Sequence, residues 1–251
     1  MAFSDEELER YARHIVLHEI GGAGQQKLKS ARVLVIGAGG LGSPAILYLA
    51  AAGVGTIGVV DDDVVSLSNL QRQVLHMTSE VGAPKVESAA RRVAEINPGV
   101  VFSGHPVRLG EKNAAELISG YDMVLDGSDN FDTRYLVNRT AVAGRKPLVS
   151  GAIGRWEGQL GVFDPASGGP CYSCVFPEPP APGLVPACAE AGVLGAMAGV
   201  IGAMQAVEAV KLITGAGAPL RGRLLLYDAL NAEVRTIRLS RRPGCVVCDP
   251  S

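Results

Sequence analysis

Apolar residues along the chain fall into two patterns, short continuous runs and longer segments with helical spacing. The runs are bounded by glycine, proline or aspartate and are typical of buried strands; they cover residues 31–37, 55–61, 99–107, 121–127, 146–154 and 156–164. Between most of them, apolar positions return every three or four residues, which predicts helices over 42–53, 84–97, 114–120 and 130–144. Strands that alternate with helices in this way predict an α/β fold whose mostly parallel sheet is covered on both faces.

The two ends of the chain depart from this alternation. Residues 4–17 place Leu8, Tyr11 and Ile15 on one helical stripe behind a capping serine, Ser4, with Glu7 three positions later. We therefore expect an N-terminal helical arm. Near the other end, the predicted strands 222–230 and 233–240 are too close together for a helix between them. They are expected to add an antiparallel pair to the sheet.

The most apolar stretch, residues 191–204, belongs to a predicted long helix over 192–213. The stretch is shorter than the roughly 20 residues that a membrane span needs, and polar residues follow it, so a buried helix is predicted. The first residues are acidic and lack a signal-peptide core. We therefore expect a cytoplasmic protein without a membrane partner.

Composition limits the domain count and the partners. With 251 residues, of which 47% are hydrophobic, the chain has enough apolar side chains for one sizeable core. A net charge of -2 gives no general attraction to nucleic acid. A single domain over 1–251 is predicted, in which the regions are a helical arm (1–30), a core that contains a glycine-rich loop (31–165), a first cysteine pair with a crossover loop (166–191), and a long helix with antiparallel strands and a second cysteine pair (192–251).

The stretch "VLVIGAGGLGS", residues 33–43, carries the candidate nucleotide chemistry. Gly37, Gly39 and Gly42 match G-x-G-x-x-G directly between a predicted strand and a predicted helix. Asp61 ends the next strand, about 20 residues on, where a carboxylate accepts hydrogen bonds from a ribose. The pattern predicts a Rossmann-like, doubly wound fold that binds an adenine nucleotide, and at this point NAD and ATP both fit.

Charged residues further along bear on that choice. Arg72 and Lys85 offer cations, Asp126 lies at the end of the strand at 121–127, and Asp129 follows it. A triphosphate needs cations and a metal, whereas the pyrophosphate of NAD needs little beyond backbone amides. Asp129 is a candidate magnesium ligand. The ordinary alternative is that the two cations are solvated surface charges and that Asp129 caps a helix.

Two C-x-x-C pairs, "CYSC" and "CVVC", predict a metal site. Cys171, Cys174, Cys245 and Cys248 can form a tetrahedral Cys₄ zinc site, which is structural because four thiolates leave no open position. It would act as a C-terminal staple on the body of the protein. Two disulfides or buried free thiols are the alternatives. A fifth cysteine, Cys188, lies in a proline-rich stretch and its role stays open.

Beyond these motifs, the chain resembles the MoeB/ThiF family of E1-like enzymes over almost its whole length. The resemblance rests on "RYARHIVL", "VLVIGAGGLGSPAILYLAAAGVGTIGVVD", "SLSNLQRQVLH", "GAPKVESA", "DGSDNFDTRYLVN", "PLVSGAIGRWEGQLGVF" and "CAEAGVLG". It implies ATP-dependent adenylation of the C-terminal glycine carboxylate of a ubiquitin-like sulfur carrier (MoaD-, ThiS- or TtuB-like) that ends in Gly-Gly. Thiocarboxylate formation then serves molybdopterin, thiamine or tRNA thiolation.

The resemblance also implies roles for single residues. Phosphate contacts are assigned to Gly39, Gly40, Gly42, Arg72 and Lys85, with Asn69 and Gln73 beside them. Asp61 is assigned to the ribose, with Asp63 among the nucleotide-binding residues, and Asp129 to magnesium. The four cysteines of the two pairs correspond to the zinc site of the family.

The resemblance further implies that Arg13 reaches the nucleotide of the other subunit of a homodimer. In ThiF-like relatives a cysteine at the position of Cys188 joins covalently to the carrier, whereas MoeB-like relatives adenylate without it. No general base is expected because the attacking carboxylate is ionised at neutral pH, so His14, His18, His76 and His105 receive no catalytic role. The sequence shows no rhodanese-like segment, so a separate sulfur donor such as a cysteine desulfurase or a rhodanese is expected.

Two other functions stay open at this point. An NAD-dependent oxidoreductase would need an acid or base beside the nicotinamide, and it gives no reason for Arg13, Arg72 and Lys85 together. A non-catalytic binding protein built on an E1-like fold would be expected to have lost Asp129, Arg72 or Lys85, and all are present.

Overall fold

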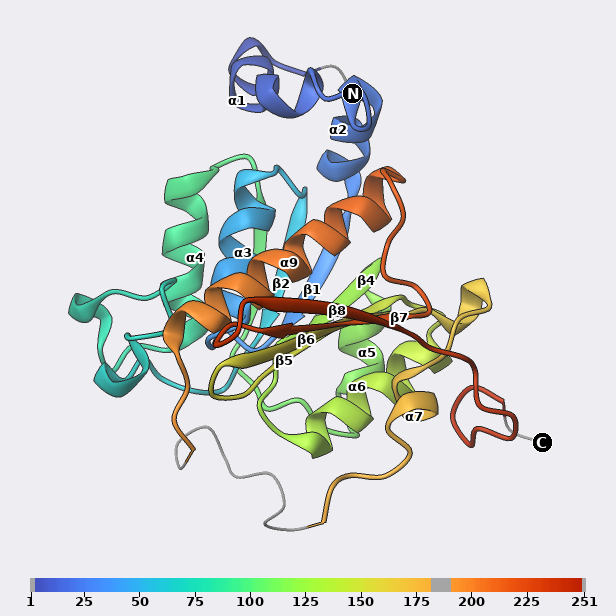
Figure 1. The fold of residues 1–251 in the computed structure, drawn as a ribbon. Helices are drawn as coiled ribbons and strands as arrows, with labels where there is room; N and C mark the ends of the chain where they lie inside the picture. The colour runs from blue at the N-terminus through green and yellow to red at the C-terminus, as the bar shows by residue number, and fades with distance from the viewer. Residues whose placement is uncertain (1–2, 182–190, 250–251) are drawn as a thin grey trace.

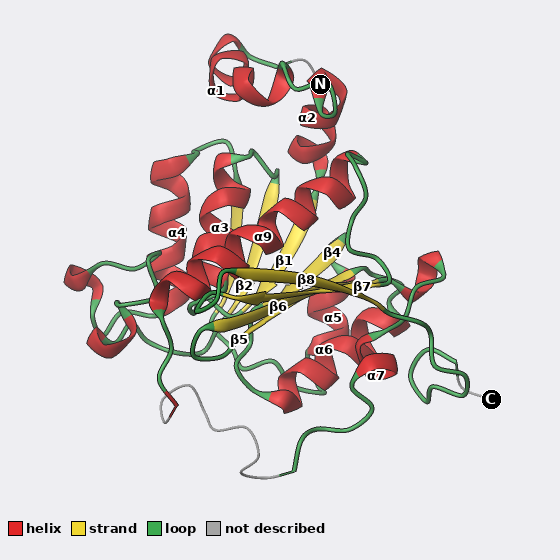
Figure 2. Ribbon diagram, viewed as in Figure 1, coloured by secondary structure: helices red, strands yellow, loops and turns green. Residues whose placement is uncertain are grey.

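The central feature of the computed structural model, which describes residues 3–181 and 191–249, is one eight-stranded sheet (Figures 1 and 2). Its strands are β1 (Arg32–Ile36), β2 (Thr56–Val60), β3 (Val101–His105), β4 (Met123–Asp126), β5 (Leu148–Ile153), β6 (Glu157–Phe163), β7 (Arg223–Asp228) and β8 (Glu233–Arg238). They lie in the order β3-β2-β1-β4-β5-β6-β7-β8.

Pairing changes from parallel to antiparallel along the sheet. The strands β3, β2, β1, β4 and β5 pair in parallel, whereas β5 to β8 pair in antiparallel fashion. The predicted mostly parallel sheet with added antiparallel strands is therefore confirmed. The strand order reverses between β1 and β4, where Ile36 and Asp126 are in register. In open α/β sheets, the carboxyl ends of the strands at such a reversal border a binding crevice.

Helices cover both faces of the sheet, as predicted. One face carries α3 (Gly42–Ala51), α4 (Lys85–Ile96) and α9 (Gly195–Thr214), and the other carries α5 (Ala114–Ser119), α6 (Phe131–Ala143) and α7 (Tyr172–Val175) (Figure 1). Because neighbouring side chains of a strand point to opposite faces, β1 contributes to both cores. Val33 and Val35 pack in the α3/α9 layer, while Leu34 and Ile36 pack in the α6 layer. Short 3₁₀ turns lie at Leu67–Asn69, Thr78–Glu80 and Pro165–Ser167.

The N-terminal arm consists of α1 (Asp5–Ile15) and α2 (Gly21–Ser30). The predicted cap is present, because the Glu7 N–H donates to Ser4 Oγ (3.2 Å) and the Ser4 N–H donates to Glu7 Oε2 (2.9 Å). Tyr11 is buried and its hydroxyl accepts a hydrogen bond from Asn97 Nδ2 (2.8 Å). The arm lies beside the amino ends of the parallel strands (Figure 1).

The long helix α9 is a core helix. It alone among the described helices has the length and apolar composition of a membrane span, yet it packs against α3, β5 and β6. It is longer than the apolar run because it continues through Gln205 and Glu208, which are buried. Glu208 Oε2 accepts from the Leu220 N–H (2.7 Å). The polar half of the helix is thus held inside the fold by hydrogen bonds.

Candidate functional site

A cleft of about 1370 Å³ opens at the carboxyl ends of the parallel strands. It continues over the face of β6, β7 and β8, where Gln159, Leu226 and Arg235 line it. Most of the predicted nucleotide-site residues line this single cleft, namely Gly39, Gly40, Asp61, Asp63, Asn69, Arg72, Gln73, Lys85 and Asp129. The fold therefore brings together residues from five separate segments of the chain.

The glycines of the loop between β1 and α3 have two roles, because some line the cleft and another is required by close packing. Gly39 and Gly40 line the cleft. Gly42 does not; a Cβ at this position would lie 1.9 Å from the carbonyl oxygen of Gly37, so only glycine fits there. The predicted phosphate contact of Gly42 stays a prediction, whereas its packing role is plain. Gly37 itself has a φ of +91°, which glycine adopts without strain.

Asp61 connects the glycine loop with the next two segments. Its Oδ2 accepts from the N–H of Ala38 (2.7 Å) and its Oδ1 accepts from the N–H of Asp63 (2.9 Å). Lys85 Nζ lies 2.7 Å from Asp63 Oδ2 and 3.9 Å from Asp61 Oδ1. Burial raises the pKa of Asp61, and the nearby Lys85 ammonium opposes this effect. A buried cation is thus placed at the cleft with acidic partners that hold it there.

The segment after β2 supplies a second cation and two amide side chains. The N–H groups of Arg72 and Gln73 donate to the Asn69 carbonyl (3.0 and 2.9 Å), which forms a compact turn. Arg72 passes over the glycine loop, since its Cγ lies 3.6 Å from where a Gly40 Cβ would be. Gln73 is buried, and within the described part of the chain its Oε1 has no hydrogen-bond donor. The segment thus offers the cleft one cation and one unpaired buried acceptor.

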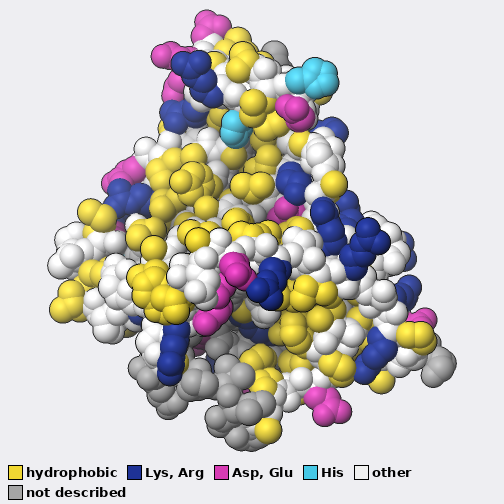
Figure 3. All heavy atoms as spheres, viewed as in Figure 1, with side chains coloured by type: hydrophobic (Ala, Val, Ile, Leu, Met, Phe, Trp, Pro, Cys, Tyr) yellow, Lys and Arg dark blue, Asp and Glu magenta, His cyan; other side chains and the backbone are white. Residues whose placement is uncertain are grey.

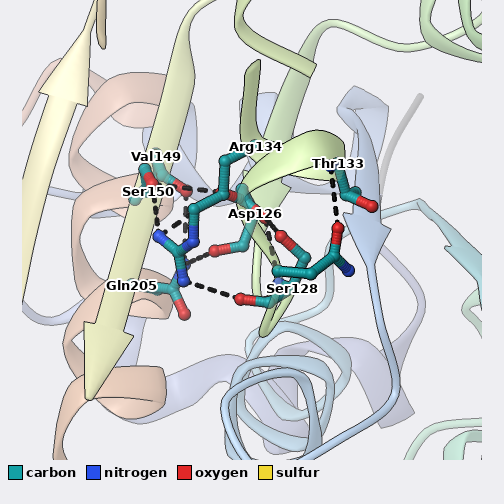
Figure 4. A network of polar contacts seen from close by, with 8 residues as sticks. Asp126, Ser128, Thr133, Arg134, Val149, Ser150 and Gln205 are labelled. Carbon is teal, nitrogen blue, oxygen red and sulfur yellow. Dashed lines mark hydrogen bonds and ion pairs between the residues drawn. The ribbon is translucent and has the colours of Figure 1, made fainter. Parts of the chain in front are cut away.

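A buried polar network supports the loop between β4 and α6 (Figure 4). Asp126 Oδ1 accepts from the Ser128 N–H (2.9 Å) and hydroxyl (2.6 Å), and Arg134 Nη2 donates to the Ser128 carbonyl (2.6 Å). Ser150 Oγ donates to Asp126 Oδ2 (3.2 Å), and Gln205 Nε2, from α9, donates to the Asp126 carbonyl (2.8 Å). The Asp126 carboxylate is therefore used to hold the loop in place and is not a candidate ligand residue.

Asp129 stands outside this network. It is exposed at the cleft, and the cap of α6 is Asn130, whose side-chain oxygen accepts from the Thr133 N–H (2.9 Å). The capping alternative for Asp129 is therefore wrong. Across residues 3–181 and 191–249 the structure gives the Asp129 carboxylate no hydrogen bond or ion pair, which suits a ligand for a hard cation.

A second acidic group borders the cleft. Asp61, Asp62 and Asp63 can bring one carboxylate oxygen each to within 4.8 Å of one another. Two of these three carboxylates already face Lys85. Asp129 is thus the better candidate for a divalent cation, because its charge is not already compensated by a neighbouring cation.

Arg13, a predicted site residue, is not part of the cleft of its own chain. Arg13 is exposed on α1, at the opposite end of the sheet (Figure 1). In the same helix Arg10 Nη1 donates to the Ile96 carbonyl (2.8 Å), which fixes α1 beside the end of α4 that is remote from Lys85. Cys188 lies outside the described residues.

The cysteine cluster (Cys171, Cys174, Cys245 and Cys248) gathers four thiols that are not disulfide-bonded. The Sγ atoms of Cys171 and Cys174 are 3.8 Å apart, those of Cys171 and Cys245 are 3.7 Å apart, and those of Cys174 and Cys248 are 3.4 Å apart. Four thiolates about 2.3 Å from a tetrahedral zinc ion lie about 3.8 Å from one another. The disulfide alternative is therefore wrong, and the spacing suits a tetrahedral metal.

Local electrostatics differ between members of the cluster. Burial raises the pKa of the Cys171 thiol far above its ordinary range, and the neighbouring Cys248 thiol adds to this effect. Burial acts in the same direction on Cys245, but backbone N–H groups of Cys248 and Val247 outweigh it and lower the pKa of Cys245 to about 6. These amides stabilise a thiolate, the form that binds a metal.

Helix α6 connects the cysteine cluster to the cleft. Asn138 Oδ1 accepts from the Tyr172 N–H (2.9 Å), and Asn138 Nδ2 donates to Ser173 Oγ (3.0 Å), so the helix holds the turn between Cys171 and Cys174. The same helix begins beside Asp129. Since Tyr172 also lines the cleft, one wall of the cleft is built on the cysteine turn.

Sequence reasoning missed three supporting residues, Arg134, Gln205 and His76. Arg134 stands within "DGSDNFDTR", and an arginine one helical turn after a cap can return to the loop before it. Gln205 is a polar residue inside the apolar helix, which is a signal for a buried hydrogen bond. His76 lies in the same segment as Arg72 and Gln73, and its ring contacts the Ala38 carbonyl (2.9 Å).

A model of the ThiF family matches residues 11–247 of the chain. The chain is 52% identical over 252 residues to the sulfur carrier protein adenylyltransferase of Thermus thermophilus, covering 99% of this chain and 93% of the relative. It is 52% identical to the SAMP-activating enzyme E1 of Haloferax volcanii, covering 96% and 89%. It is 54% identical to the probable adenylyltransferase/sulfurtransferase MoeZ of Mycobacterium tuberculosis, and spans 97% of this chain but 63% of that protein.

Among solved structures, MccB of E. coli determined with ATP has a TM-score of 0.83 and 24% identity, covering 95% of this chain and 74% of that one. A second MccB structure, with MccA-N7isoASN, has a TM-score of 0.85 at 24% identity, covering 96% and 74%. At this identity the likeness concerns the fold alone, and it agrees with the α/β architecture predicted from the sequence.

Proposed function

The chain belongs to the ThiF family, and from this premise we propose that it adenylates the C-terminal glycine carboxylate of a ubiquitin-like sulfur carrier protein. The name of the Thermus thermophilus relative, a sulfur carrier protein adenylyltransferase, supports this activity. The observation that carries the proposal is the cleft itself, where a glycine loop, the cations of Arg72 and Lys85, and the uncompensated Asp129 carboxylate border one space.

In this proposal the residues of the cleft orient ATP and neutralise its charge. The phosphates are faced by the N–H groups of Gly39 and Gly40 and by the cations of Arg72 and Lys85. Amides at a helix N-terminus and cations both favour anions. Asp61 takes the ribose at the end of β2. Asn69 and Gln73 lie beside the phosphates and Asp63 holds Lys85, which completes the predicted nucleotide set.

The reaction needs alignment more than proton transfer. The carrier carboxylate attacks the α-phosphorus of ATP, one carboxylate oxygen forms the new P–O bond, and the bond to the β-phosphate bridge breaks to release pyrophosphate. Both reactants are anions, so catalysis rests on charge neutralisation and positioning. The carboxylate is already ionised at neutral pH, so no residue has to act as a general base.

The size of the cleft supports a protein substrate. Small-molecule pockets are typically about 300–1,000 Å³, and this cleft is larger. Its extension over β6, β7 and β8 has room for an extended C-terminal tail that ends at the nucleotide. A carrier ending in Gly-Gly suits this passage, because a tail without side chains can lie close to the sheet.

Two metals belong to the proposal. Asp129 would hold Mg²⁺, which supplies charge neutralisation at the phosphates when it is bound. The cysteine cluster would hold a structural Zn²⁺, as its Sγ distances and the stabilised thiolate of Cys245 suit a closed four-sulfur site.

We also propose that the protein is a cytoplasmic homodimer that acts as a single adenylation domain. Arg13 cannot reach its own cleft from the opposite end of the sheet, so its predicted role requires a second copy. Apolar side chains gather on the outer face of α3 and α9 (Figure 3), where Tyr48 and Val207 are exposed. Such a surface favours association with another chain. A separate sulfur donor, a cysteine desulfurase or a rhodanese, would follow the adenylation.

ATP–pyrophosphate exchange with Mg²⁺ tests the proposal directly. Exchange is expected in the presence of a small ubiquitin-like protein ending in Gly-Gly, and not with the same protein lacking its last glycine. Mixing Arg13→Ala protein with Asp129→Ala protein should restore part of the exchange that each variant lacks, because a mixed dimer holds one intact site. Binding of NAD without exchange for any of several carriers would overturn the proposal.

A further inference from the structure

His76 occupies a buried junction beneath the cleft and does not line it. The residue is 5% exposed. On one side Nε2 lies 2.9 Å from the carbonyl oxygen of Ala38, and on the other side Nδ1 lies 2.8 Å from Ser88 Oγ. A carbonyl oxygen only accepts hydrogen bonds. Nε2 is therefore the protonated nitrogen in this contact, and it donates to Ala38.

The junction joins three segments that carry predicted ATP contacts. Ala38 belongs to the glycine loop, His76 ends the segment that begins with Asn69, and Ser88 lies in the first turn of α4, close to Lys85. The His76 N–H donates to the Gln73 carbonyl (3.2 Å), so the ring is also tied to the turn that bears Gln73. One side chain thereby sets the relative position of all three segments.

The contact with Ala38 has a specific consequence for the peptide that joins Ala38 and Gly39. In a trans peptide the C=O and N–H groups point in opposite directions. When His76 holds the Ala38 carbonyl on the buried side, the N–H of Gly39 faces the other way, toward the cleft that Gly39 lines. In the described part of the chain, this N–H has no intramolecular acceptor.

Neighbouring contacts make the orientation of that one peptide depend on His76. The preceding peptide is held separately, because the N–H of Ala38 donates to Asp61 Oδ2 (2.7 Å). Gly39 and Gly40 follow without side chains, and glycine rotates at little cost. A rotation of the Ala38–Gly39 peptide would turn a carbonyl oxygen toward the phosphates in place of an N–H group, and repulsion would replace attraction.

We propose that His76 is a positioning residue for ATP, which donates Nε2–H to the Ala38 carbonyl and so keeps the Gly39 N–H directed at the phosphates. The inference rests on the proposed function, since it assigns the cleft to ATP. It adds a residue for which sequence reasoning expected no role in the reaction.

Two near-isosteric substitutions separate the two contacts of the ring. In His76→Gln the amide nitrogen can occupy the place of Nε2 and still donate to Ala38, whereas in His76→Asn it occupies the place of Nδ1 and reaches only Ser88. The Kd for ATP with Mg²⁺ is expected to rise about tenfold in His76→Asn and in His76→Leu, the loss expected for one hydrogen bond to a charged group. His76→Gln should stay within about threefold of the wild type.

Binding of adenosine distinguishes this positioning role from a general structural role, because a general structural defect would weaken adenosine binding as well. It lacks phosphates, so its Kd, measured by competition, is expected to be equal in the wild type and the variants. Ser88→Ala, which removes the partner of Nδ1 and leaves the Ala38 contact, should bind ATP like the wild type. Thermal unfolding checks that each variant is folded. If His76→Leu does not fold, the comparison of His76→Gln with His76→Asn is sufficient for the test.

Three results would overturn the proposal. The first is that His76→Asn binds ATP as tightly as His76→Gln. The second is that the Kd values for ATP and for adenosine rise together in the His76 variants. The third is that Ser88→Ala raises the Kd for ATP as much as His76→Asn does. If the wild-type protein binds ATP and shows carrier-dependent exchange, but the His76 variants all bind ATP equally well, only this inference is overturned. Wild-type protein that binds no ATP removes the proposed function as well.

Discussion

The cleft and the cysteine cluster are two ligand sites built on opposite principles. The cleft gathers charged groups from separate loops and stays open to its substrates. The cysteine cluster brings together two pairs of thiols that are far apart in sequence, and these thiols are largely buried. The loops of the cleft are held by supporting contacts from residues such as Asp61, His76 and Arg134, whereas in the cluster the proposed metal would itself join the four cysteines.

This difference predicts where a substitution shows its effect. Changes at exposed cleft residues such as Asp129 should alter binding and rate with little change in stability, because these side chains are not part of the core. Changes at the cysteine cluster should alter stability first, because the proposed metal would crosslink two distant parts of the chain. Helix α6 begins at the first site and contacts the second, so a change at one of its buried residues that contact the cysteine turn should affect both.

The largest effect is expected for Asp129→Asn. It should lower carrier-dependent ATP–pyrophosphate exchange about 10³-fold, the loss of about 4 kcal/mol of transition-state stabilisation. The melting temperature should not change, since Asp129 is exposed and Asn130 caps the helix. Asp132→Asn, at an exposed acid of the first turn of α6, is the matched control and should retain exchange. Equal losses in both variants would argue against a metal ligand at Asp129.

The next effect concerns the cysteine cluster. Cys171→Ser, or strong chelation of zinc, should lower the free energy of unfolding by about 3 kcal/mol, because loss of a structural metal is among the severe mechanisms of destabilisation. For a chain of this length that is roughly 6–12 °C in Tm. Differential scanning calorimetry of the wild-type protein, with and without chelator, measures it, and added Zn²⁺ should reverse the chelator effect. An unchanged Tm after verified metal removal contradicts a structural zinc.

A smaller effect that involves both regions is expected for Asn138→Ala. This substitution leaves the buried Tyr172 N–H without its acceptor, which should cost about 2 kcal/mol of stability. Because Tyr172 lines the cleft, exchange should also fall, but only by a few-fold. Arg139→Ala, on the exposed side of the same helix, is the control. Loss of stability with fully unchanged kinetics would show that α6 does not couple the regions.

The smallest effect is a pH dependence at Glu80, which supports His76 through Ser88. Burial acts to raise the pKa of Glu80, but hydrogen bonds from the Ser88 hydroxyl (2.5 Å) and Arg91 Nε (2.9 Å) outweigh it and lower the pKa below its ordinary value of 4.5. A lowered native pKa contributes stability that is present above about pH 4.5 and is lost as the pH falls through the native value.

Replacement of Glu80 by Gln removes this titration. Urea unfolding at a series of pH values should show a stability difference between wild type and Glu80→Gln that is full near pH 7 and shrinks in acid. A difference that stays constant from pH 7 down through the acid range would mean that the native pKa of Glu80 is not lowered.

Local spacing explains why much of both regions could be predicted. The glycine loop, Asp61 and the two C-x-x-C pairs each depend on neighbours within a short stretch, and their residue types limit what they can do. The strand and helix pattern then placed Asp129 at the same end of the sheet as Gly39. The packing role of Gly42 was not predicted, because it depends on the path of the Gly37 carbonyl.

The supporting contacts could not be predicted because they join distant parts of the chain. Gln205 of α9 donates to the carbonyl of Asp126 at the end of β4, and the ring of His76 contacts the carbonyl of Ala38 in the glycine loop. The helix α2 was also not predicted in detail, since its glycines disfavour a helix. It forms because Leu28 is buried and because Gln25 Nε2 donates to the Ala52 carbonyl (2.8 Å).

The outer strand β8 has a consequence for the behaviour of the protein in concentrated solution. It pairs on one side with β7, and in the described structure its other edge is open, with every residue from Glu233 to Arg238 exposed. Open edges invite sheet-to-sheet aggregation, which charged side chains oppose. Glu233, Arg235 and Arg238 supply that opposition beside the apolar Val234 and Ile237. Since salt screens such charges, the colloidal stability of the protein should fall as ionic strength rises.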